Sequence, residues 1–220
     1  MDGNGVDSVN SLSYTDTNVV YNSSWGKINQ GADFYNSSSN GGIALANSTN
    51  FDTQTPSISM WVFTASGVGW GFQEWAFERS SAYQLFNYGG TWYWRIAGIG
   101  DCTYSFTGNS VTDGWHHVVV NYDGTNSNFY LDGTLVNNVT AGGTIGTGSG
   151  TIGLGSAASG GSIWGGGVGG VYNTRAMDEV GIWSRALTGA EVTSLYNGGS
   201  GFQYPFSAAA PVNGNFFLMF

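Results

Sequence analysis

The sequence is poor in charge, and most of the charge it has is negative. Only 9% of the 220 residues are charged, against about 25% in a typical soluble domain, and five basic residues face fourteen acidic ones. With a net charge of −9, the chain has no basic stripe to neutralise phosphates, which excludes nucleic acid and anionic membranes as partners. Its solubility must come from Asn, Ser, Thr and glycine-rich loops, a surface suited to neutral polar partners.

Cysteine is nearly absent, and neither a leader nor a membrane span is visible. The single cysteine, Cys102, cannot form an internal disulfide, so packing must hold the fold, with a metal ion as an additional alternative. The first five residues lack the basic and apolar parts of a signal peptide, and no apolar stretch is long enough to cross a bilayer. If this is the native start, we expect no secretion through a signal peptide.

The hydrophobic pattern predicts one large β domain. Hydrophobic residues make up 41% of the chain, and they alternate with polar residues between borders of Gly, Asn and Asp. Asp-Gly pairs at Asp123 and Asp132 predict that three successive strands form a meander. The strands that we expect are 57–63, 115–122, 128–131, 134–139, 151–154 and 177–183.

One stretch departs from this pattern and predicts a helix. Thr188 and Glu191 form a capping box, in which the hydroxyl and the carboxylate each accept a free backbone N–H. Asn197 and the two glycines after it tolerate the left-handed conformation found at helix C-termini. We expect a short helix from Thr188 to about Tyr196.

Several motifs, taken in order, resemble one family. They are Gly31-Ala32-Asp33-Phe34, Ser57-Ile58-Ser59-Met60-Trp61-Val62, Trp115-His116-His117-Val118, Tyr130-Leu131-Asp132-Gly133 and Met177-Asp178-Glu179-Val180-Gly181-Ile182-Trp183. Their order and spacing are similar to those of the laminin G-like (concanavalin A-like lectin/glucanase) superfamily, over roughly residues 1–199. The resemblance implies an all-β fold, a two-sheet antiparallel jelly-roll sandwich with one short helix in the C-terminal region.

Residues 200–220 form a strongly apolar tail after the last motif. So many aromatic residues left in water would favour aggregation, so we expect an assembly segment buried against another subunit or a symmetry copy. The protein is then a homo-oligomer or part of a larger assembly.

The resemblance also implies a structural calcium ion in many members of the family. It is held by the aspartate that opens the last strand, here Asp178. Because calcium takes about six to eight oxygen ligands, we expect Asp2 and Asn36 to contribute as well. In the alternative, Asp178 caps a turn or pairs with Arg175.

Tryptophans are the expected ligand-binding residues. Trp92 and Trp94 share one face of a strand, and Trp70 and Trp164 lie in or near glycine-rich loops. Aromatic faces accept the apolar face of a sugar ring, while neutral polar groups bond its hydroxyls, so we expect a neutral glycan as ligand. The alternative, favoured for any single tryptophan, is that it fills the core.

Catalytic chemistry is not expected. Laminarinase-type glycoside hydrolases use Glu-x-Asp-x-Glu on a strand; here Glu74 and Glu78 fall on one face of a regular strand, but Ala76 replaces the aspartate and Arg79 can neutralise the second glutamate. His116 and His117 point to opposite faces, so both are expected to be structural.

These features favour a non-catalytic recognition or adhesion domain that binds carbohydrate. A signal-less chain with an extracellular type of fold can leave a cell by lysis, so we expect a bacteriophage virion surface, as a capsid decoration or fibre protein in contact with other virion subunits. Two alternatives stay open: a purely structural virion cement protein without glycan binding, and a laminarinase-type hydrolase.

Overall fold

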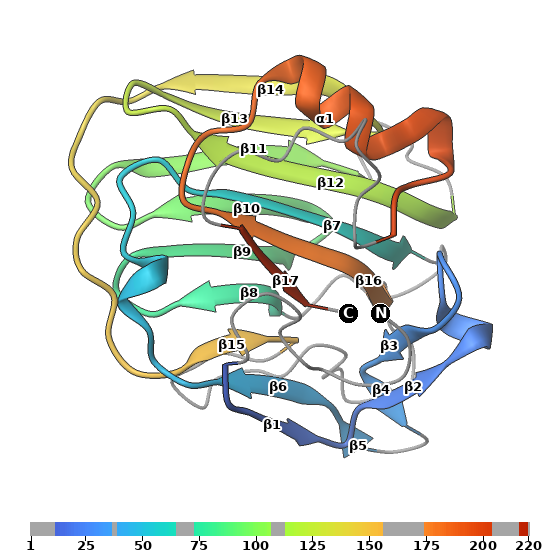
Figure 1. The fold of residues 1–220 in the computed structure, drawn as a ribbon. Coiled ribbons are helices and arrows are strands. Elements are labelled where there is room, and N and C mark those ends of the chain that lie inside the picture. Colours follow the sequence, from blue (N-terminus) through green and yellow to red (C-terminus); the bar gives the residue numbers. More distant parts are fainter. Residues whose placement is uncertain are drawn as a thin grey trace.

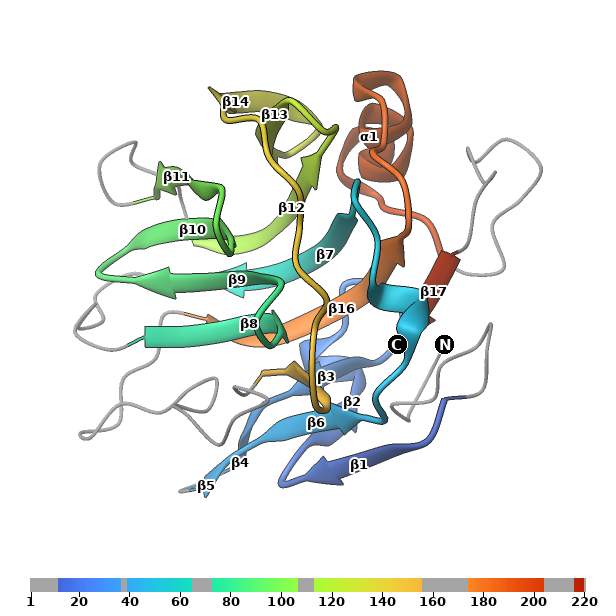
Figure 2. The ribbon, with the colours of Figure 1, turned by 90° about the vertical axis from the view of Figure 1, so that its left-hand side faces the viewer.

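The chain folds into two antiparallel β-sheets that face each other, as Figures 1 and 2 show. The computed structural model describes residues 12–36, 39–64, 73–106, 113–155, 174–203 and 216–219. Within these ranges the fold is the predicted all-β jelly-roll sandwich with a single short α-helix, α1 (Gly189–Tyr196). Three short 3-10 segments accompany it: η1 (Ser23–Trp25), η2 (Thr49–Phe51) and η3 (Asn197–Gly199).

Sheet I is the seven-stranded sheet. One of its faces packs into the core, and the other carries exposed residues such as Tyr88. In spatial order its strands are β1 (Tyr14–Thr17), β6 (Gly42–Leu45), β15 (Ile152–Leu154), β8 (Gln73–Arg79), β9 (Tyr83–Tyr88), β10 (Thr91–Ile96) and β11 (Gly100–Ser105).

Sheet II contains the predicted meander, β12-β13-β14, and the predicted strands β7 and β16. A small separate sheet is formed by β4 (Tyr35–Asn36) and β5 (Ser39–Asn40). In spatial order sheet II has β14 (Thr134–Thr140), β13 (Asn126–Leu131), β12 (Gly114–Tyr122), β7 (Ser57–Thr64), β16 (Thr174–Trp183), β3 (Gly31–Asp33) and β2 (Val20–Asn22), with β17 (Phe216–Met219) beside β16.

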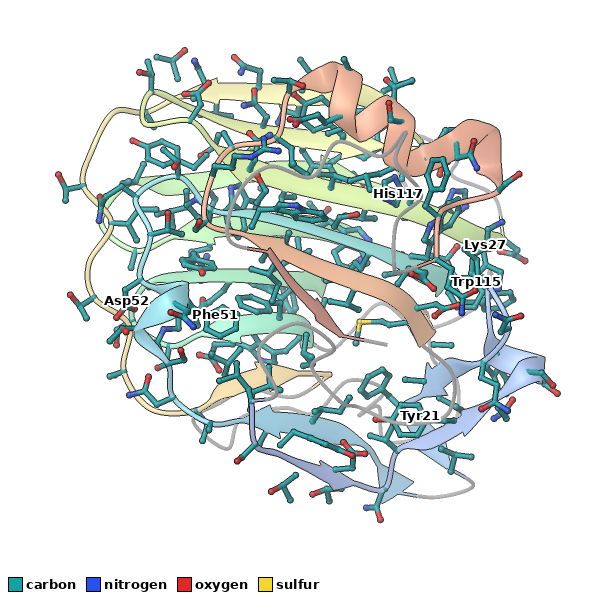
Figure 3. The ribbon with its side chains drawn as sticks, viewed as in Figure 1. Tyr21, Lys27, Phe51, Asp52, Trp115 and His117 are labelled. Atoms are coloured by element: carbon teal, nitrogen blue, oxygen red, sulfur yellow. The ribbon has the colours of Figure 1, made fainter. Side chains whose placement is uncertain are left out.

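The core lies between the sheets because successive side chains of a strand point to opposite faces. On β12, Val118 and Val120 join the main core, whereas Val119 faces the other way, into a smaller cluster with Val192 and Leu195 of α1. Figure 3 shows how densely side chains fill the sandwich. Each fully buried large apolar side chain contributes about 1.5–3 kcal/mol, so packing alone can hold the fold without a disulfide.

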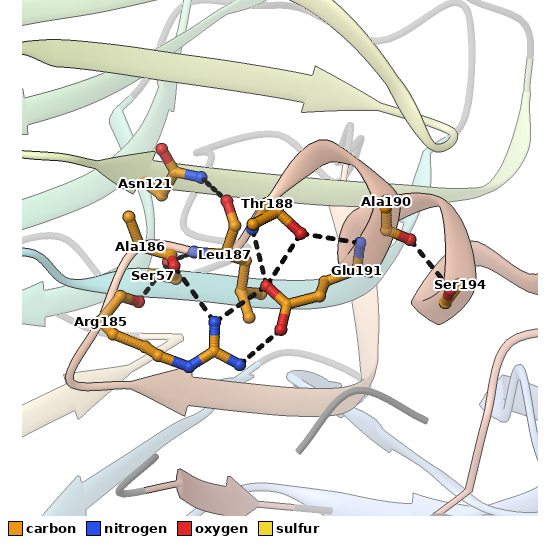
Figure 4. A network of polar contacts seen from close by, with 9 residues as sticks. All are labelled: Ser57, Asn121, Arg185, Ala186, Leu187, Thr188, Ala190, Glu191 and Ser194. Atoms are coloured by element: carbon orange, nitrogen blue, oxygen red, sulfur yellow. Dashed lines mark hydrogen bonds and ion pairs between the residues drawn. The ribbon is translucent and has the colours of Figure 1, made fainter. Parts of the chain in front are cut away.

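The predicted capping box begins α1. Thr188 Oγ1 accepts the N–H of Glu191 at 3.3 Å, and Glu191 Oε2 accepts the N–H of Thr188 at 2.7 Å. Arg185 adds two hydrogen bonds to the same carboxylate, of 2.6 and 2.8 Å, and Figure 4 shows this network. The helix ends as predicted, with Asn197 in the left-handed conformation at φ +50°. No helix in the described ranges has the length and hydropathy to span a membrane.

Part of the apolar tail is a strand of this same domain. Phe216–Met219 pairs antiparallel with Val180–Trp183 of β16. We expected the tail to lie against another subunit, but these four residues instead extend sheet II of their own chain. The pairing covers an edge of β16 that would otherwise expose unpaired backbone groups.

Candidate functional site

Two of the four predicted ligand-binding tryptophans are buried in the core. Trp92 and Trp94 are both 0% exposed, and Trp94 Nε1 donates to the carbonyl of Asn121, across in sheet II, at 3.2 Å. We therefore correct their role from ligand contact to core packing: the face of β10 that they share is the inner one. Trp70 and Trp164 lie outside the described residues.

The outer face of β10 carries the aromatic site. Tyr93 lies directly opposite Phe86 of β9, which lies opposite Trp75 of β8. The Phe86 and Tyr93 rings stack with centroids 5.0 Å apart and planes 3° apart, and the Trp75 and Phe86 centroids are 4.9 Å apart. Trp75 and Tyr93 remain half-buried on either side of the buried Phe86. We call Trp75, Phe86 and Tyr93 the aromatic row.

The sequence indicates which face of β10 is exposed, although the prediction of the binding tryptophans did not use this pattern. In Trp92-Tyr93-Trp94-Arg95, the two tryptophans alternate with Tyr93 and Arg95. A charged side chain is rarely buried without a partner, so Arg95 marks the solvent side of the strand and Tyr93 shares that side.

A β-bulge on β8 brings Trp75 and Glu78 to the same outer face. The register against β9 shifts between Trp75 and Phe77, which makes Ala76 the extra residue. Ala76 and Phe77 are both 0% exposed in the core, although neighbours in a regular strand point to opposite sides. The alternation is therefore shifted by one residue, and Trp75 and Glu78 fall on one side.

This register contradicts the prediction that Glu74 and Glu78 share a face. Glu74 is paired with Asn87 and Glu78 with Gln84, and positions 84 and 87 belong to opposite faces of β9. Glu78 is 3% exposed and accepts a hydrogen bond from Gln84 Nε2 at 3.0 Å. The flanking pair of carboxylates that a glycosidase requires is not formed at these positions.

Arg79 pairs with Asp52, and not with the adjacent Glu78 as the sequence suggested. Its guanidinium is 1% exposed and pairs with Asp52, whose Oδ1 lies 2.8 Å from Nη2. The pair holds the segment after η2 against β8, so Arg79 is a structural residue of this edge.

An ion pair lies beside the aromatic row. Arg95 is opposite Asp101 of β11 and donates to it twice, from Nε and from Nη2, at 2.8 Å each. The guanidinium also lies over the Phe86 ring, 5.0 Å from its centroid. The hydrogen bonds to Asp101 raise the pKa of Arg95, so the guanidinium stays charged.

Two hollows share Arg95, and the larger one borders the aromatic row. The larger has about 450 Å³ of empty space, opens to solvent and is lined by Phe86, Tyr88, Tyr93 and Arg95. Tyr88 is 53% exposed, so its ring and hydroxyl are available. The smaller hollow, of about 180 Å³, is lined by Ser81, Ala82, Tyr83, Gln84, Arg95 and Ala97. The site thus offers ring faces, hydroxyl and amide groups and a guanidinium.

Asp178 anchors a turn. Its Oδ2 accepts the N–H groups of Lys27 and Ile28 at 2.8 Å each, and its Oδ1 accepts the N–H of Glu179 at 2.9 Å. Burial raises the pKa of Asp178 to about 6, although these backbone donors lower it.

This geometry is the turn-capping alternative considered for Asp178. Of the other predicted calcium ligands, Asp2 lies outside the described residues, and Asn36 lies in β4 (Tyr35–Asn36), where the structure describes the backbone alone. No group of three or more His, Cys, Asp or Glu residues gathers as metal ligands in the described part of the chain. The calcium site therefore stays a prediction.

The two histidines have separate structural partners, as expected from their opposite directions. His116 Nδ1 lies 2.8 Å from Asp132 Oδ2. His117 is 2% exposed, with its Nε2 2.8 Å from Ser59 Oγ and its ring 5.1 Å from that of Trp61. Burial lowers the pKa of His117 to about 3, so this ring is neutral at pH 7.

Comparisons with known proteins agree with this architecture. Residues 37–193 match a model of the concanavalin A-like lectin/glucanases superfamily, and no curated protein matches the chain. The binding domain of botulinum neurotoxin DC in complex with SialylT has a TM-score of 0.63 at 13% identity, over 88% of this chain and 47% of that one.

Two further solved structures have the same fold. The serotype G binding domain gives a TM-score of 0.67 at 16% identity, over 87% of this chain and 47% of its own. A type C neurotoxin structure, whose description concerns interaction with two ganglioside molecules, gives 0.65 at 13%, over 90% and 50%. The chain thus spans about half the length of these three structures, and the likeness shows the fold.

Proposed function

The chain belongs to the concanavalin A-like lectin/glucanases superfamily, and from this premise we propose that it is a non-catalytic domain that binds a neutral glycan. The observation that carries the proposal is the aromatic row on the outer face of sheet I, with an open hollow beside it.

The chemistry of this surface suits a sugar. Ring faces such as those of Tyr88 and Tyr93 can cover the apolar face of a pyranose, while tyrosine hydroxyls and the Gln84 amide can bond its hydroxyls. Because these side chains stand on paired strands, they are held in place before the ligand arrives, which reduces the entropy lost on binding.

Two observations favour binding over hydrolysis. The register places Glu74 and Glu78 at positions on opposite faces of β8, and Glu78 is buried and hydrogen-bonded. The similar solved structures are binding domains, and the type C neurotoxin is described as interacting with gangliosides, which carry sugars.

The proposal is tested with a glycan array and titration calorimetry on three variants. Tyr88→Ala and Tyr93→Ala should each weaken binding about tenfold or more, which corresponds to about 1.4 kcal/mol, because each removes a ring face. Leu135→Ala is the control, since Leu135 is 48% exposed on β14 of the other sheet, and its binding should match the unchanged protein. Unaltered affinity in both tyrosine variants would refute the site.

The biological setting stays a prediction from the sequence. If the domain is a capsid decoration or fibre protein of a bacteriophage virion, it should co-sediment with purified particles and be detected in them by mass spectrometry. If it does so but binds no glycan on the array, the structural cement alternative accounts for it better.

A further inference from the structure

We propose that Asp101 is the residue that makes this site select uncharged glycans over acidic ones, because it occupies the guanidinium of Arg95. The inference rests on the proposed glycan-binding function of the outer face of sheet I. It adds a specificity determinant that the aromatic rings alone do not supply.

Arg95 is placed where a ligand would meet it. It lines both hollows, its side chain is 44% exposed, and its guanidinium lies over Phe86, 5.0 Å from the ring centroid. A guanidinium held on an aromatic ring beside an open hollow is a strong receptor for a carboxylate, which it binds through two parallel hydrogen bonds.

Asp101 already makes those two hydrogen bonds. Its Oδ1 and Oδ2 accept from Nε and Nη2 of Arg95 at 2.8 Å each, so one complete edge of the guanidinium is used. The cross-strand register fixes the contact, because Arg95 and Asp101 are directly opposite on β10 and β11. A sialic acid or uronic acid carboxylate could take this edge only by displacing a partner that belongs to the same chain, and at the other edge it would meet a guanidinium that Asp101 already neutralises.

The polar residues aligned with Arg95 across the sheet make this displacement less favourable. Across β8, β9, β10 and β11, the register aligns Glu78, Gln84, Arg95 and Asp101. These aligned positions carry two carboxyl groups and one guanidinium, in a chain whose net charge is −9. An acidic glycan therefore meets like charge, which penalises the wrong ligand, whereas a neutral glycan does not.

Removal of the Asp101 charge should reverse this selection. In Asp101→Asn the side chain keeps its size but no longer neutralises Arg95. The variant's affinity for acidic glycans, relative to its affinity for their neutral counterparts, should rise at least tenfold. In the double variant Asp101→Asn/Arg95→Gln the gain should disappear, because no guanidinium remains to receive the carboxylate.

The experiment uses an array of neutral oligosaccharides printed beside their sialylated and uronic acid counterparts, with calorimetry on the bound pairs. Circular dichroism melting curves check that each variant folds. The expected result is that the unchanged protein binds neutral members more strongly than acidic ones and that Asp101→Asn acquires the acidic members.

The outcomes separate this inference from the function on which it rests. If the unchanged protein binds neutral glycans but Asp101→Asn gains no acidic binding, or if the unchanged protein prefers the acidic member of a pair, the role of Asp101 is refuted and the binding function stands. If Asp101→Asn acquires acidic binding but no neutral glycan binds either protein, the neutral-glycan function is refuted instead. If neither protein binds any member, both are refuted.

Discussion

Replacement of Arg79 by methionine should destabilise the domain by about 3–5 kcal/mol, the cost of breaking a buried ion pair by removing one partner. Arg79 is 1% exposed, and it donates five hydrogen bonds. They run to Asp52 Oδ1 (from both Nε and Nη2), to Asn47 Oδ1, and to the carbonyl oxygens of Gly148 and Gly150.

The magnitude follows from these contacts. At about 1 kcal/mol net for each hydrogen bond, five bonds are worth about 5 kcal/mol. Water relieves part of the loss, because the Asp52 side chain is 18% exposed and lies where the segment after η2 runs (Figure 3). Methionine keeps most of the apolar length of the arginine side chain, so the change removes the polar contacts with little loss of packing volume.

Urea denaturation measures the effect, with the slope of free energy against denaturant checked for constancy. Arg95→Met is the matched control: the pair of Arg95 and Asp101 is exposed by 44% and 30%, so its loss should cost no more than about 1 kcal/mol. The double variant Arg79→Met/Asp52→Asn should recover part of the stability, because it also removes the charge left alone. Equal destabilisation by Arg79→Met and Arg95→Met would refute the reasoning.

Two further predictions concern pH and metal. Burial lowers the pKa of His117 to about 3, so between about pH 6.5 and 3 the unfolded chain binds this proton more readily, and the stability from neutral His117 is lost as the pH falls through that range. As the pH falls, the urea midpoint of the unaltered protein should fall more steeply than that of His117→Gln. Parallel profiles of the two proteins would contradict this. The raised pKa of Asp178 acts in the opposite direction, but it affects both proteins equally because both keep this residue. If calcium binds at Asp178 with Asp2 and Asn36, a chelator should lower the melting temperature at pH 7. The effect should be absent in Asp178→Asn, and an unchanged curve in the unaltered protein would argue against the ion.

Elements specified by local chemistry were predictable from the sequence. The Asp-Gly turns set the register of the β12-β13-β14 meander, and the capping box of Thr188 and Glu191 fixed the start of α1. In each case the residues that determine the structure lie within a few positions of one another, so no knowledge of the distant chain is needed.

The candidate site was less predictable because it depends on what packs behind each strand. Alternation shows that Trp92 and Trp94 share a face, but only the opposing sheet makes that face the inner one. Whether a tryptophan can bind sugar is therefore decided by its neighbours in space. The pairing of Phe216–Met219 with β16 is likewise a long-range contact: the apolar composition of the tail predicted burial, but not the strand with which the tail pairs.

The bulge at Ala76 disrupts the laminarinase-type arrangement of carboxylates on β8 more than the missing aspartate does. A one-letter edit, Ala76→Asp, would restore Glu-x-Asp-x-Glu in the written sequence, yet position 76 points into the dry interior. The new carboxylate would be stranded among hydrocarbon, at a cost in folding free energy, instead of standing between two acids in solvent. Formation of the laminarinase-type arrangement would first require a shift in the register of β8, so backbone geometry, and not residue identity alone, determines whether these carboxylates can be brought together.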